Sequence, residues 1–331
     1  MISSDARLIK ALREAEVHLT AGDLAFAIGD LRETIEPRIH ALRQAGFDVE
    51  FRPGFGYRLL SSPDRLIADD LWARLGDSTM VREIVTLEET GSTNDVAAQF
   101  GRQGAASGLA IFAEHQSAGR GRFGRRWESV SHAGLWFSLL LRPAMEVQFW
   151  PRLTTWTAVC VASALDSKMR RRAGIKWPND VCLLGKKVSG ILIEMGADVE
   201  QKPFAVVGIG LNVNHEEADF PPELRATATS LRQVTGQKTS RAELAADLLR
   251  TMSERLGLLA THFDQLLAEA AERSILLGNW IKVQAGDSVM LGIAEELDPE
   301  GRLVLRTEDG GRTSLSAGEV TLHAGWPIPS A

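Results

Sequence analysis

A chain of 331 residues is long enough for two or three domains with separate cores, and its 44% apolar and 24% charged residues are ordinary for a globular protein. Its formal net charge of −6 excludes a general electrostatic attraction to nucleic acid or to an anionic membrane. No apolar run approaches the roughly 18 residues of a membrane-spanning helix, so we expect no membrane partner.

The two cysteines, Cys160 and Cys182, have neither metal-ligand nor redox spacing. A chain of this size without a disulfide framework is typical of a reducing compartment. The first helical pattern already carries charged residues from Asp5 to Glu14, unlike a secretory signal. We therefore expect a cytoplasmic protein without a metal site of its own.

The first 62 residues predict three helices followed by a two-stranded ribbon. Residues 5–15 have helical periodicity, Thr20 can cap a second helix, and a third helix ends near Gly46. Residues 49–52 and 57–60 then flank a Pro-Gly-Phe-Gly turn, which is a β-ribbon signal. This order of elements predicts a winged helix-turn-helix, a fold that binds DNA.

Two features of this segment bear on DNA binding. Eight Lys and Arg against nine Asp and Glu give it a net charge of −1, although phosphate contacts supply most DNA affinity. Pro37 would cost about 3 kcal/mol inside the third helix, unless that helix begins with Thr34 as its N-cap. The shorter helix leaves Arg38, His40 and Arg43 as candidate DNA contacts. A winged helix kept for packing or dimerisation remains the alternative.

Residues 63–80 predict a linker that contains a helix, and from Val81 strands alternate with helices. The expected strands are residues 81–88, 108–113, 135–142, 175–184, 188–195 and 204–214, with helical regions over 151–167 and 240–273. Short loops between several strands indicate a mixed sheet. After Gly278 only short strands and turns follow, which predicts a small β-barrel over residues 277–325.

The glycine–arginine loop, residues 116–126, contains three glycines and four arginines. Glycines let backbone amides approach a ligand closely, and arginines match carboxylate or phosphate oxygens, so the mixture indicates an anion site. Its G-x-G-x-x-G pattern is not a dinucleotide fingerprint, because residues 134–141 predict a strand where a helix is needed. A P-loop is excluded because Arg125 and Arg126 replace its Lys-Ser/Thr pair. A solvated basic loop is the alternative.

Three further stretches carry candidate site residues, namely 91–95, 176–190 and 208–214. Taken singly, each has an ordinary explanation. Ser92 could cap the following helix, and Lys187 could be an exposed loop lysine. Trp177 could pack within a turn, while Asn212 and Asn214 could face solvent.

Together these stretches resemble the biotin protein ligase family in order, identity and approximate spacing from about residue 88 to 214, and the glycine–arginine loop matches almost letter for letter. The Pro-Gly-x-Gly-Tyr ribbon is similar to that of bifunctional ligase/repressors, and the C-terminal strands loosely resemble the family's last domain. The resemblance implies an α+β multidomain chain with a winged helix-turn-helix at 1–62, a linker helix at 63–80, a class II synthetase-like mixed α/β catalytic domain at 81–275 and an SH3-like β-barrel at 276–331.

The family's activity would be ATP-dependent activation of biotin as biotinyl-5'-AMP, with Mg²⁺ carried by ATP, and transfer to a lysine of a biotin carboxyl carrier domain. Operator DNA and a second copy of the chain, joined at the edge of the central sheet, would be further partners. Two alternatives stay open: a lipoate-type protein ligase, which shares the chemistry, and a biotin-responsive DNA-binding regulator without transfer activity.

Carried over residue by residue, the resemblance assigns biotin binding to Ser92, Thr93, Asn94, Gln116, Arg120, Gly121, Arg122, Lys187 and Gly190. It assigns ATP and adenylate binding to Arg122, Arg125, Trp127, Lys176, Asn179 and Asn212, and catalysis to Arg120, Arg122 and Lys187. The residue types agree with this chemistry, because a carboxylate that attacks a phosphate needs fixed cations and amide donors more than a base. We also predict that the loop is mobile without ligand and ordered with it.

Overall fold

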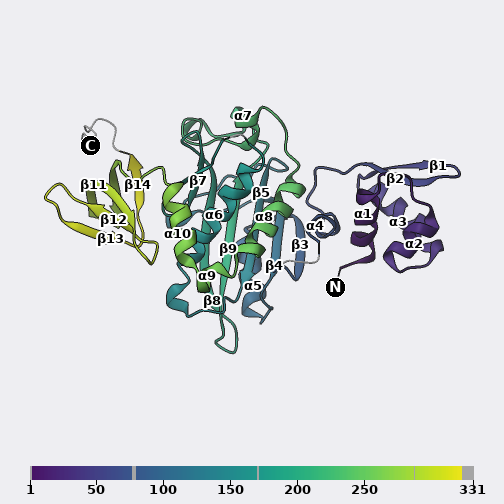
Figure 1. Ribbon diagram of the computed structural model, residues 1–331, viewed down its shortest axis with the longest axis horizontal. Coiled ribbons are helices and arrows are strands. Elements are labelled where there is room, and N and C mark those ends of the chain that lie inside the picture. Colours follow the sequence, from purple (N-terminus) through teal and green to yellow (C-terminus); the bar gives the residue numbers. More distant parts are fainter. Residues whose placement is uncertain (1, 77–79, 170, 287, 323–331) are drawn as a thin grey trace.

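The computed structural model describes residues 2–76, 80–169, 171–286 and 288–322. The chain forms three units in sequence order along its longest axis (Figure 1). We name them the N-terminal unit (residues 4–61), the central unit (83–272) and the C-terminal unit (280–322). Each encloses buried apolar side chains of its own. None of the helices in the described ranges has the length and apolar character needed to cross a membrane.

Three helices and a hairpin build the N-terminal unit, as expected. They are α1 (Ser4–Glu14), α2 (Ala21–Ile28), α3 (Arg32–Gln44) and the antiparallel strands β1 (Asp48–Arg52) and β2 (Gly56–Ser61). Thr20 caps α2, since its hydroxyl accepts from Asp23 N at 3.2 Å while Asp23 Oδ2 accepts from Thr20 N at 3.0 Å. The predicted cap is confirmed.

The start of α3 differs from the prediction. Leu31 is the N-cap residue, and the expectation that Thr34 fills this position is wrong. Thr34 lies in the first turn, where its amide and hydroxyl both donate to Leu31 O, at 3.1 and 2.7 Å. Pro37 is therefore interior to the helix, and Glu33 O lacks the amide partner that another residue type would supply.

Helix α4 (Ala68–Leu75) joins the N-terminal and central units and is shorter than the predicted linker helix, of which residues 77–79 lie outside the described residues. It packs between α1 and α8 (Arg241–Arg255). Asp70 of α4 is 1% exposed and pairs with Arg13 of α1 and, at 2.8 Å, with Arg74. The buried carboxylate of Asp70 thus fixes the linker to the first helix through Arg13.

The central sheet is mixed, as predicted, with strand order β3-β4-β5-β9-β8-β7-β6, in which only the β3–β4 pair is parallel. Its strands are β3 (Glu83–Thr90), β4 (Leu109–Gln116), β5 (Gly134–Leu141), β6 (Gly174–Lys176), β7 (Asp180–Leu183), β8 (Lys186–Ala197) and β9 (Pro203–Asn212). The single strand predicted over 175–184 was wrong. It is two strands, because the turn at Trp177–Pro178 interrupts it and proline has no amide for a ladder.

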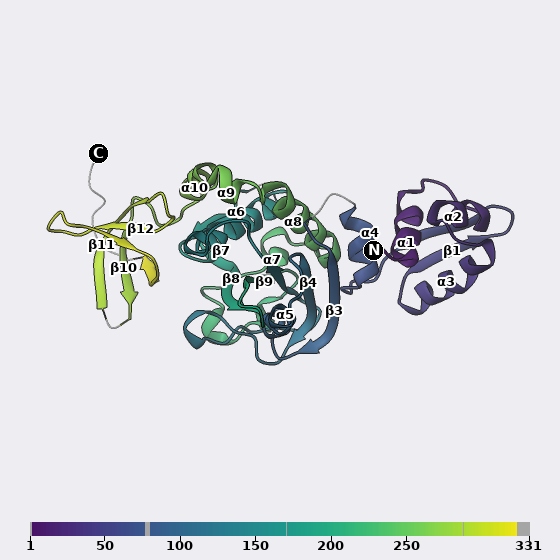
Figure 2. The same cartoon turned by 90° about the horizontal axis from the view of Figure 1, so that it is seen from below.

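Helices cover both faces of this sheet (Figure 2). Helix α5 (Thr93–Arg102) lies on one face, where Ala97 packs against Ile111 and Phe204. The other face carries α6 (Arg152–Asp166), α8, α9 (Leu258–Thr261) and α10 (Phe263–Glu272), so the helical region predicted to end near 273 is three helices. Short elements complete the unit, namely α7 (Leu231–Thr235) and the 3₁₀ turns Arg122–Gly124, Val147–Phe149, Glu217–Asp219 and Pro222–Leu224.

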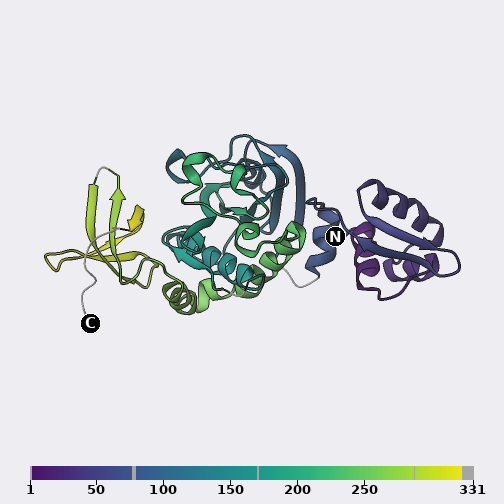
Figure 3. The ribbon, with the colours of Figure 1, turned by 90° about the horizontal axis from the view of Figure 1, so that it is seen from above.

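The C-terminal unit is an antiparallel sheet in the order β13-β12-β11-β10-β14, beyond the α9–α10 end of the central unit (Figure 3). Its strands are β10 (Trp280–Ala285), β11 (Ser288–Leu297), β12 (Leu303–Arg306), β13 (Arg312–Leu315) and β14 (Glu319–Leu322). Trp177 of the central unit is buried against its core, and its Nε1 donates to Gly301 O at 3.1 Å. Closure as an SH3-like barrel stays a prediction, as do residues 323–331, which lie outside the described residues.

Candidate functional site

A pocket of about 470 Å³ opens in the central unit beside the glycine–arginine loop and reaches β14 of the C-terminal unit. All the residues that the sequence predicts for biotin and ATP line it: Ser92, Thr93, Asn94, Gln116, Arg120, Gly121, Arg122, Arg125, Trp127, Lys176, Asn179, Lys187, Gly190 and Asn212. They come from stretches up to 120 residues apart in the chain, from Ser92 to Asn212. The individual roles of these residues stay predictions.

Neutral polar groups at the start of α5 form one wall of the pocket. Ser92, Thr93 and Asn94 are buried. Thr93 N donates to Gln116 Oε1 at 2.8 Å, which ties this wall to the end of β4. Ser92 has the backbone position of an N-cap, but its side chain makes no capping hydrogen bond. Helix capping therefore does not account for the Ser92 hydroxyl. This wall can offer uncharged donors and acceptors to a ligand.

The glycine–arginine loop folds back on itself. Gly121 N donates to Arg125 O at 2.7 Å, and Trp127 N donates to Gly119 O at 2.9 Å. A side chain at Gly119 would place its Cβ 2.7 Å from Trp127 O, so this close approach requires glycine. The two ends of the loop are therefore hydrogen-bonded to each other, and the position of one end fixes the position of the other.

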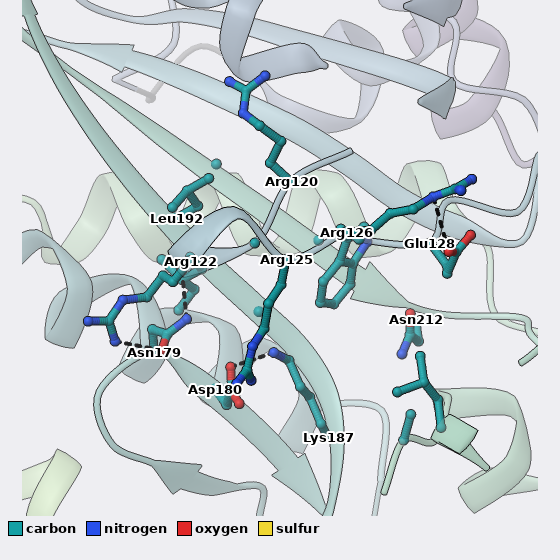
Figure 4. A pocket seen from close by; sticks show the side chains of 18 of the residues that line it. Arg120, Arg122, Arg125, Arg126, Glu128, Asn179, Asp180, Lys187, Leu192 and Asn212 are labelled. Atoms are coloured by element: carbon teal, nitrogen blue, oxygen red, sulfur yellow. Dashed lines mark hydrogen bonds and ion pairs between the residues drawn. The ribbon is translucent and has the colours of Figure 1, made fainter. Parts of the chain in front are cut away.

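Cations face the interior of the pocket, with Arg122 and Lys187 near Asn179 and Asp180 (Figure 4). Arg122 Nη1 donates to Asn179 Oδ1 at 3.2 Å, and burial lowers the pKa of the guanidinium. Lys187 Nζ lies 2.7 Å from Asp180 Oδ1 and 5.3 Å from the ring centre of Trp127. Lys187 is thus not a solvated loop lysine, and this side of the pocket is suited to an anion.

The Arg120 side chain points away from these cations (Figure 4). Its Nη1 and Nη2 donate to the two carboxylate oxygens of Asp95, at 2.6 and 2.7 Å, and the hydrogen bond to Asp95 raises the pKa of Arg120. Glu194 lies 3.5 Å from Nη2. The structure does not bring the Arg120 guanidinium to Arg122 and Lys187, so this geometry does not support its predicted catalytic role.

One end of the pocket is aromatic. Trp127 meets Trp136 edge-on at 6.0 Å, Trp136 meets His215 at 5.7 Å, and His215 stacks on Phe220 at 5.2 Å. His215 and Phe220 were not predicted from the sequence, because only the fold brings them together. Burial lowers the pKa of His215 to about 4, so its ring is uncharged at neutral pH.

Two glycines make room for the Trp127 ring. A Cβ at Gly210 of β9 would lie 2.5 Å from the indole, and a Cβ at Gly190 of β8 would lie 2.7 Å from it. Glycine inside a strand marks a close approach of this kind, so the Gly208-Ile209-Gly210 pattern was a usable sequence signal. The two glycines thus allow the Trp127 ring to lie against β8 and β9 at the pocket.

Asn212 and Asn214 are both buried, so the explanation that they face solvent is wrong. Asn212 Nδ2 donates to Thr229 O at 3.1 Å beside the pocket. Asn214 exchanges hydrogen bonds with the backbone of Thr239, both at 2.9 Å. Asn212 therefore belongs to the site, whereas Asn214 supports the chain that follows it.

The residues predicted to contact DNA have partners inside the N-terminal unit. Arg38 pairs with Asp5 at 2.6 Å and with Asp30 at 2.9 Å. Arg43 Nη2 donates to Val49 O at 2.7 Å, and His40 lies 3.0 Å from the Gln44 amide. The two arginines are thus held by intramolecular contacts.

Comparison with known proteins agrees with this site. The Biotin/lipoate A/B protein ligase family matches residues 87–214, and the Biotin protein ligase C terminal domain matches residues 276–322. The bifunctional ligase/repressor BirA of Bacillus subtilis is 33% identical over 312 residues, 94% of this chain and 96% of that protein. The biotin–[acetyl-CoA-carboxylase] ligase of Mycobacterium tuberculosis is 34% identical over 264 residues, 78% of this chain and 94% of that protein.

Among solved structures, the biotin protein ligase from Aquifex aeolicus in complex with biotin and ATP is similar, with a TM-score of 0.62 and 31% identity. The match covers 73% of this chain and 99% of that one. The identity along nearly the whole chain and the match of two family models lead to one conclusion. This chain belongs to the biotin protein ligase family.

Proposed function

We infer that the protein is an ATP-dependent ligase that activates biotin as biotinyl-5'-AMP and transfers the biotinyl group to a lysine of a biotin carboxyl carrier domain. The observation that carries this inference is the pocket, which joins a neutral polar wall, a cationic side and an aromatic end. These surfaces are suited in turn to a ureido ring, to a carboxylate beside a phosphate, and to adenine.

Biotin occupies the polar wall in this proposal. The hydroxyls of Ser92 and Thr93 and the amides of Asn94 and Gln116 are donors and acceptors for the ureido ring. The burial of Ser92, Thr93 and Asn94 supports the assignment, because an uncharged polar ligand can replace water there without leaving a charge unpaired. Gly121 and Gly190 line the route along which the chain of biotin would reach the cations.

The nucleotide occupies the aromatic end. Trp127 stacks on the adenine, and Asn212 with Phe220 borders it. Lys176, Asn179 and Arg125 lie on the phosphate side. Mg²⁺ would arrive with ATP, held mainly by phosphate oxygens and water, because the ion retains several waters in nucleotide sites.

Arg122 and Lys187 carry the chemistry in this proposal. The biotin carboxylate attacks the α-phosphorus, the bond to the leaving pyrophosphate breaks, and negative charge grows on the phosphoryl oxygens. Fixed cations stabilise that charge without reorganisation. The carrier lysine then attacks the acyl carbon of the mixed anhydride and AMP leaves, a step that needs little more than positioning. Closure of the glycine–arginine loop would exclude water from the intermediate.

We further propose that the chain regulates transcription at an operator, with the N-terminal unit as a winged helix-turn-helix. The similarity to BirA of Bacillus subtilis supports this, because it spans 94% of the chain and that relative is named a ligase/repressor. The proposed domains are residues 1–62, 63–80, 81–275 with a class II synthetase-like sheet, and 276–331 with an SH3-like barrel.

A homodimer and a cytoplasmic location complete the proposal. The pairing of β8 with β7 ends at Gly190, so within the described residues 192–197 pair with β9 on one side only. This open edge supports pairing with a second copy. Cys160 and Cys182 are buried free thiols, which is consistent with a reducing cytosol.

The test is transfer to a carrier protein. Purified protein is incubated with ATP, Mg²⁺, a carboxylase carrier domain and either biotin or lipoate, and the carrier is weighed by intact-mass spectrometry. We expect one biotinyl group on one lysine and no lipoyl group. Lipoyl transfer would favour the lipoate-type alternative, and no transfer of either acid would favour a regulator without ligase activity.

A further inference from the structure

The glycine–arginine loop is tied to the protein by a charged contact between Arg120, which lines the pocket, and two carboxylates that do not line it. The two carboxylate oxygens of Asp95 accept from the two terminal nitrogens of Arg120, and Glu194 lies 3.5 Å away. We propose that Asp95 and Glu194 are positioning residues that anchor the loop through Arg120, and so keep the activated intermediate in the pocket. This rests on the proposed adenylation, but the anchor itself can be tested without it.

Fixing Arg120 fixes the whole loop. Arg120 and Arg126 face each other in an antiparallel bridge, with the bonds from Gly121 N to Arg125 O and from Trp127 N to Gly119 O on either side. Because these bonds join its two ends, we expect the loop to move as a rigid unit. The anchor at Arg120 therefore also sets the position of Arg122, a loop cation that lines the pocket.

A hydrogen-bonded chain links this anchor to the wall proposed for biotin. Glu194 Oε2 accepts from Asn94 Nδ2 at 2.6 Å, and Asn94 Oδ1 accepts from Ser138 Oγ at 2.6 Å. The Ser138 and Thr93 hydroxyls are hydrogen-bonded at 2.7 Å, and Thr93 N donates to Gln116 Oε1. A ligand that binds Thr93 or Gln116 thus acts on the chain that orients Glu194.

The anchor suits a contact that forms and breaks in each cycle. Asp95 lies in the first turn of α5, where the helix favours a carboxylate, and the hydrogen bond from Arg120 lowers the pKa of Asp95. The pair is bidentate but exposed to solvent, so its contribution is modest. We expect its loss to change loop opening by about three- to tenfold.

Loss of the anchor would expose the biotinyl-5'-AMP intermediate to hydrolysis by water. When the loop opens, water attacks the acyl carbon of biotinyl-5'-AMP, the anhydride bond breaks, and biotin and AMP are released. Each such event consumes one ATP and releases one pyrophosphate without modifying a carrier. The quantity that reports the anchor is therefore the rate of pyrophosphate release in the absence of carrier protein.

The experiment compares Asp95→Asn, Glu194→Gln and the charge swap Asp95→Arg/Arg120→Asp in the full chain. The swap is made together with Glu194→Gln, so that the carboxylate introduced at position 120 does not face Glu194. Hydrogen exchange of the Gly121 and Trp127 amides is measured without ligand, and pyrophosphate release is measured with biotin and ATP but without carrier. We expect both to rise about three- to tenfold in the single variants and to return toward wild type in the swap. The control Glu272→Gln removes the exposed carboxylate partner of Arg172, far from the loop in the chain, and should change neither.

The outcomes separate the anchor from the proposed function. Unchanged amide exchange in Asp95→Asn would overturn the anchor, whatever the enzyme does. Faster exchange in the single variants that the charge swap does not reduce would overturn the ion pair as its cause. A wild-type protein that never releases pyrophosphate with biotin would overturn the proposed function, and retention of the intermediate with it.

Discussion

The central pocket and the N-terminal unit both offer cations to a ligand, but they hold them differently. In the pocket, Arg122 donates to a neutral amide, that of Asn179, and the side chain of Lys176 has no ion pair or hydrogen bond with any described residue. Lys187 has a single carboxylate partner, Asp180. In the N-terminal unit, Arg38 contacts two carboxylates and Arg43 donates twice to Val49 O. Arg122 and Lys176 are thus available to an anion in the pocket, whereas Arg38 and Arg43 of the N-terminal unit are held by internal contacts.

The difference teaches that the partner of an arginine, more than its presence, decides what the arginine can bind. A guanidinium already matched by a carboxylate must break that contact before it meets a phosphate. Arg120 is an example within the site itself. Its guanidinium is hydrogen-bonded to the Asp95 carboxylate and so lies away from Arg122 and Lys187. The following variants test this distinction, from the largest expected effect to the smallest.

Arg241 is the clearest case of a positive charge that is used inside the protein. It is 0% exposed and pairs with Glu114. Burial alone would raise the pKa of Glu114, but the hydrogen bonds from Arg241 and Leu66 N hold it below its usual value. We expect Glu114→Gln to lower the free energy of unfolding by about 3 kcal/mol, because it leaves the buried Arg241 with Asp64, a half-exposed side chain, as its remaining carboxylate partner. Urea denaturation measures this, and an unchanged midpoint would show that the pair is not a structural centre.

Among the pocket cations, Lys187 should matter most for activity. We expect Lys187→Ala to slow biotin-dependent pyrophosphate exchange about 100- to 1000-fold, because it removes a fixed charge beside the reacting phosphate. The neighbouring Lys186 is the matched control, since its Nζ donates to Arg225 O outside the pocket. Lys186→Ala should keep its activity within about threefold. Equal losses in the two variants would contradict a special role for Lys187.

His215 is a base in the pocket that burial keeps uncharged, unlike the arginines and lysines compared above. Its pKa is about 4 in the folded protein, against an ordinary value of 6.5 for the unfolded chain, so the unfolded chain binds the proton more tightly. The stability it contributes is fully present above pH 6.5 and is lost as pH falls toward 4, by about 3 kcal/mol at most. His215→Gln should flatten the decline in unfolding free energy between pH 6.5 and 4. A decline as steep as that of wild type would contradict the effect of burial on this ring.

The smallest effect is expected in the N-terminal unit. Arg38→Ala should weaken duplex DNA binding less than about fivefold, because Asp5 and Asp30 already match its charge. Arg58 of β2 is exposed and forms no ion pair within the described residues, so Arg58→Ala should weaken binding more and reduce the salt slope by about one. Mobility shifts with and without biotinyl-5'-AMP at two salt concentrations measure both. A larger loss in Arg38→Ala would reverse the comparison.

The sequence predicted where the pocket lies, because the pocket residues lie in short motifs that can be recognised by their order and spacing along the chain. It did not predict the Arg120 contacts, since Asp95 and Glu194 are 25 and 74 residues away along the chain. His215 and Phe220 were missed because neither lies in one of these motifs, and only folding stacks the two rings. Local signals placed the cap at Thr20 correctly but misplaced the start of α3, where backbone bonds to Leu31 decide the boundary.

The most informative single measurement is acid-dependent exchange of labelled pyrophosphate into ATP, with purified protein, Mg²⁺ and either biotin, lipoate or no acid. Exchange with biotin and not with lipoate is the expected result, because the neutral wall around Thr93 and Gln116 is suited to a ureido ring beside the cations. Absence of exchange with biotin would contradict the proposed function, since it would leave the pocket as a binding site without adenylation chemistry.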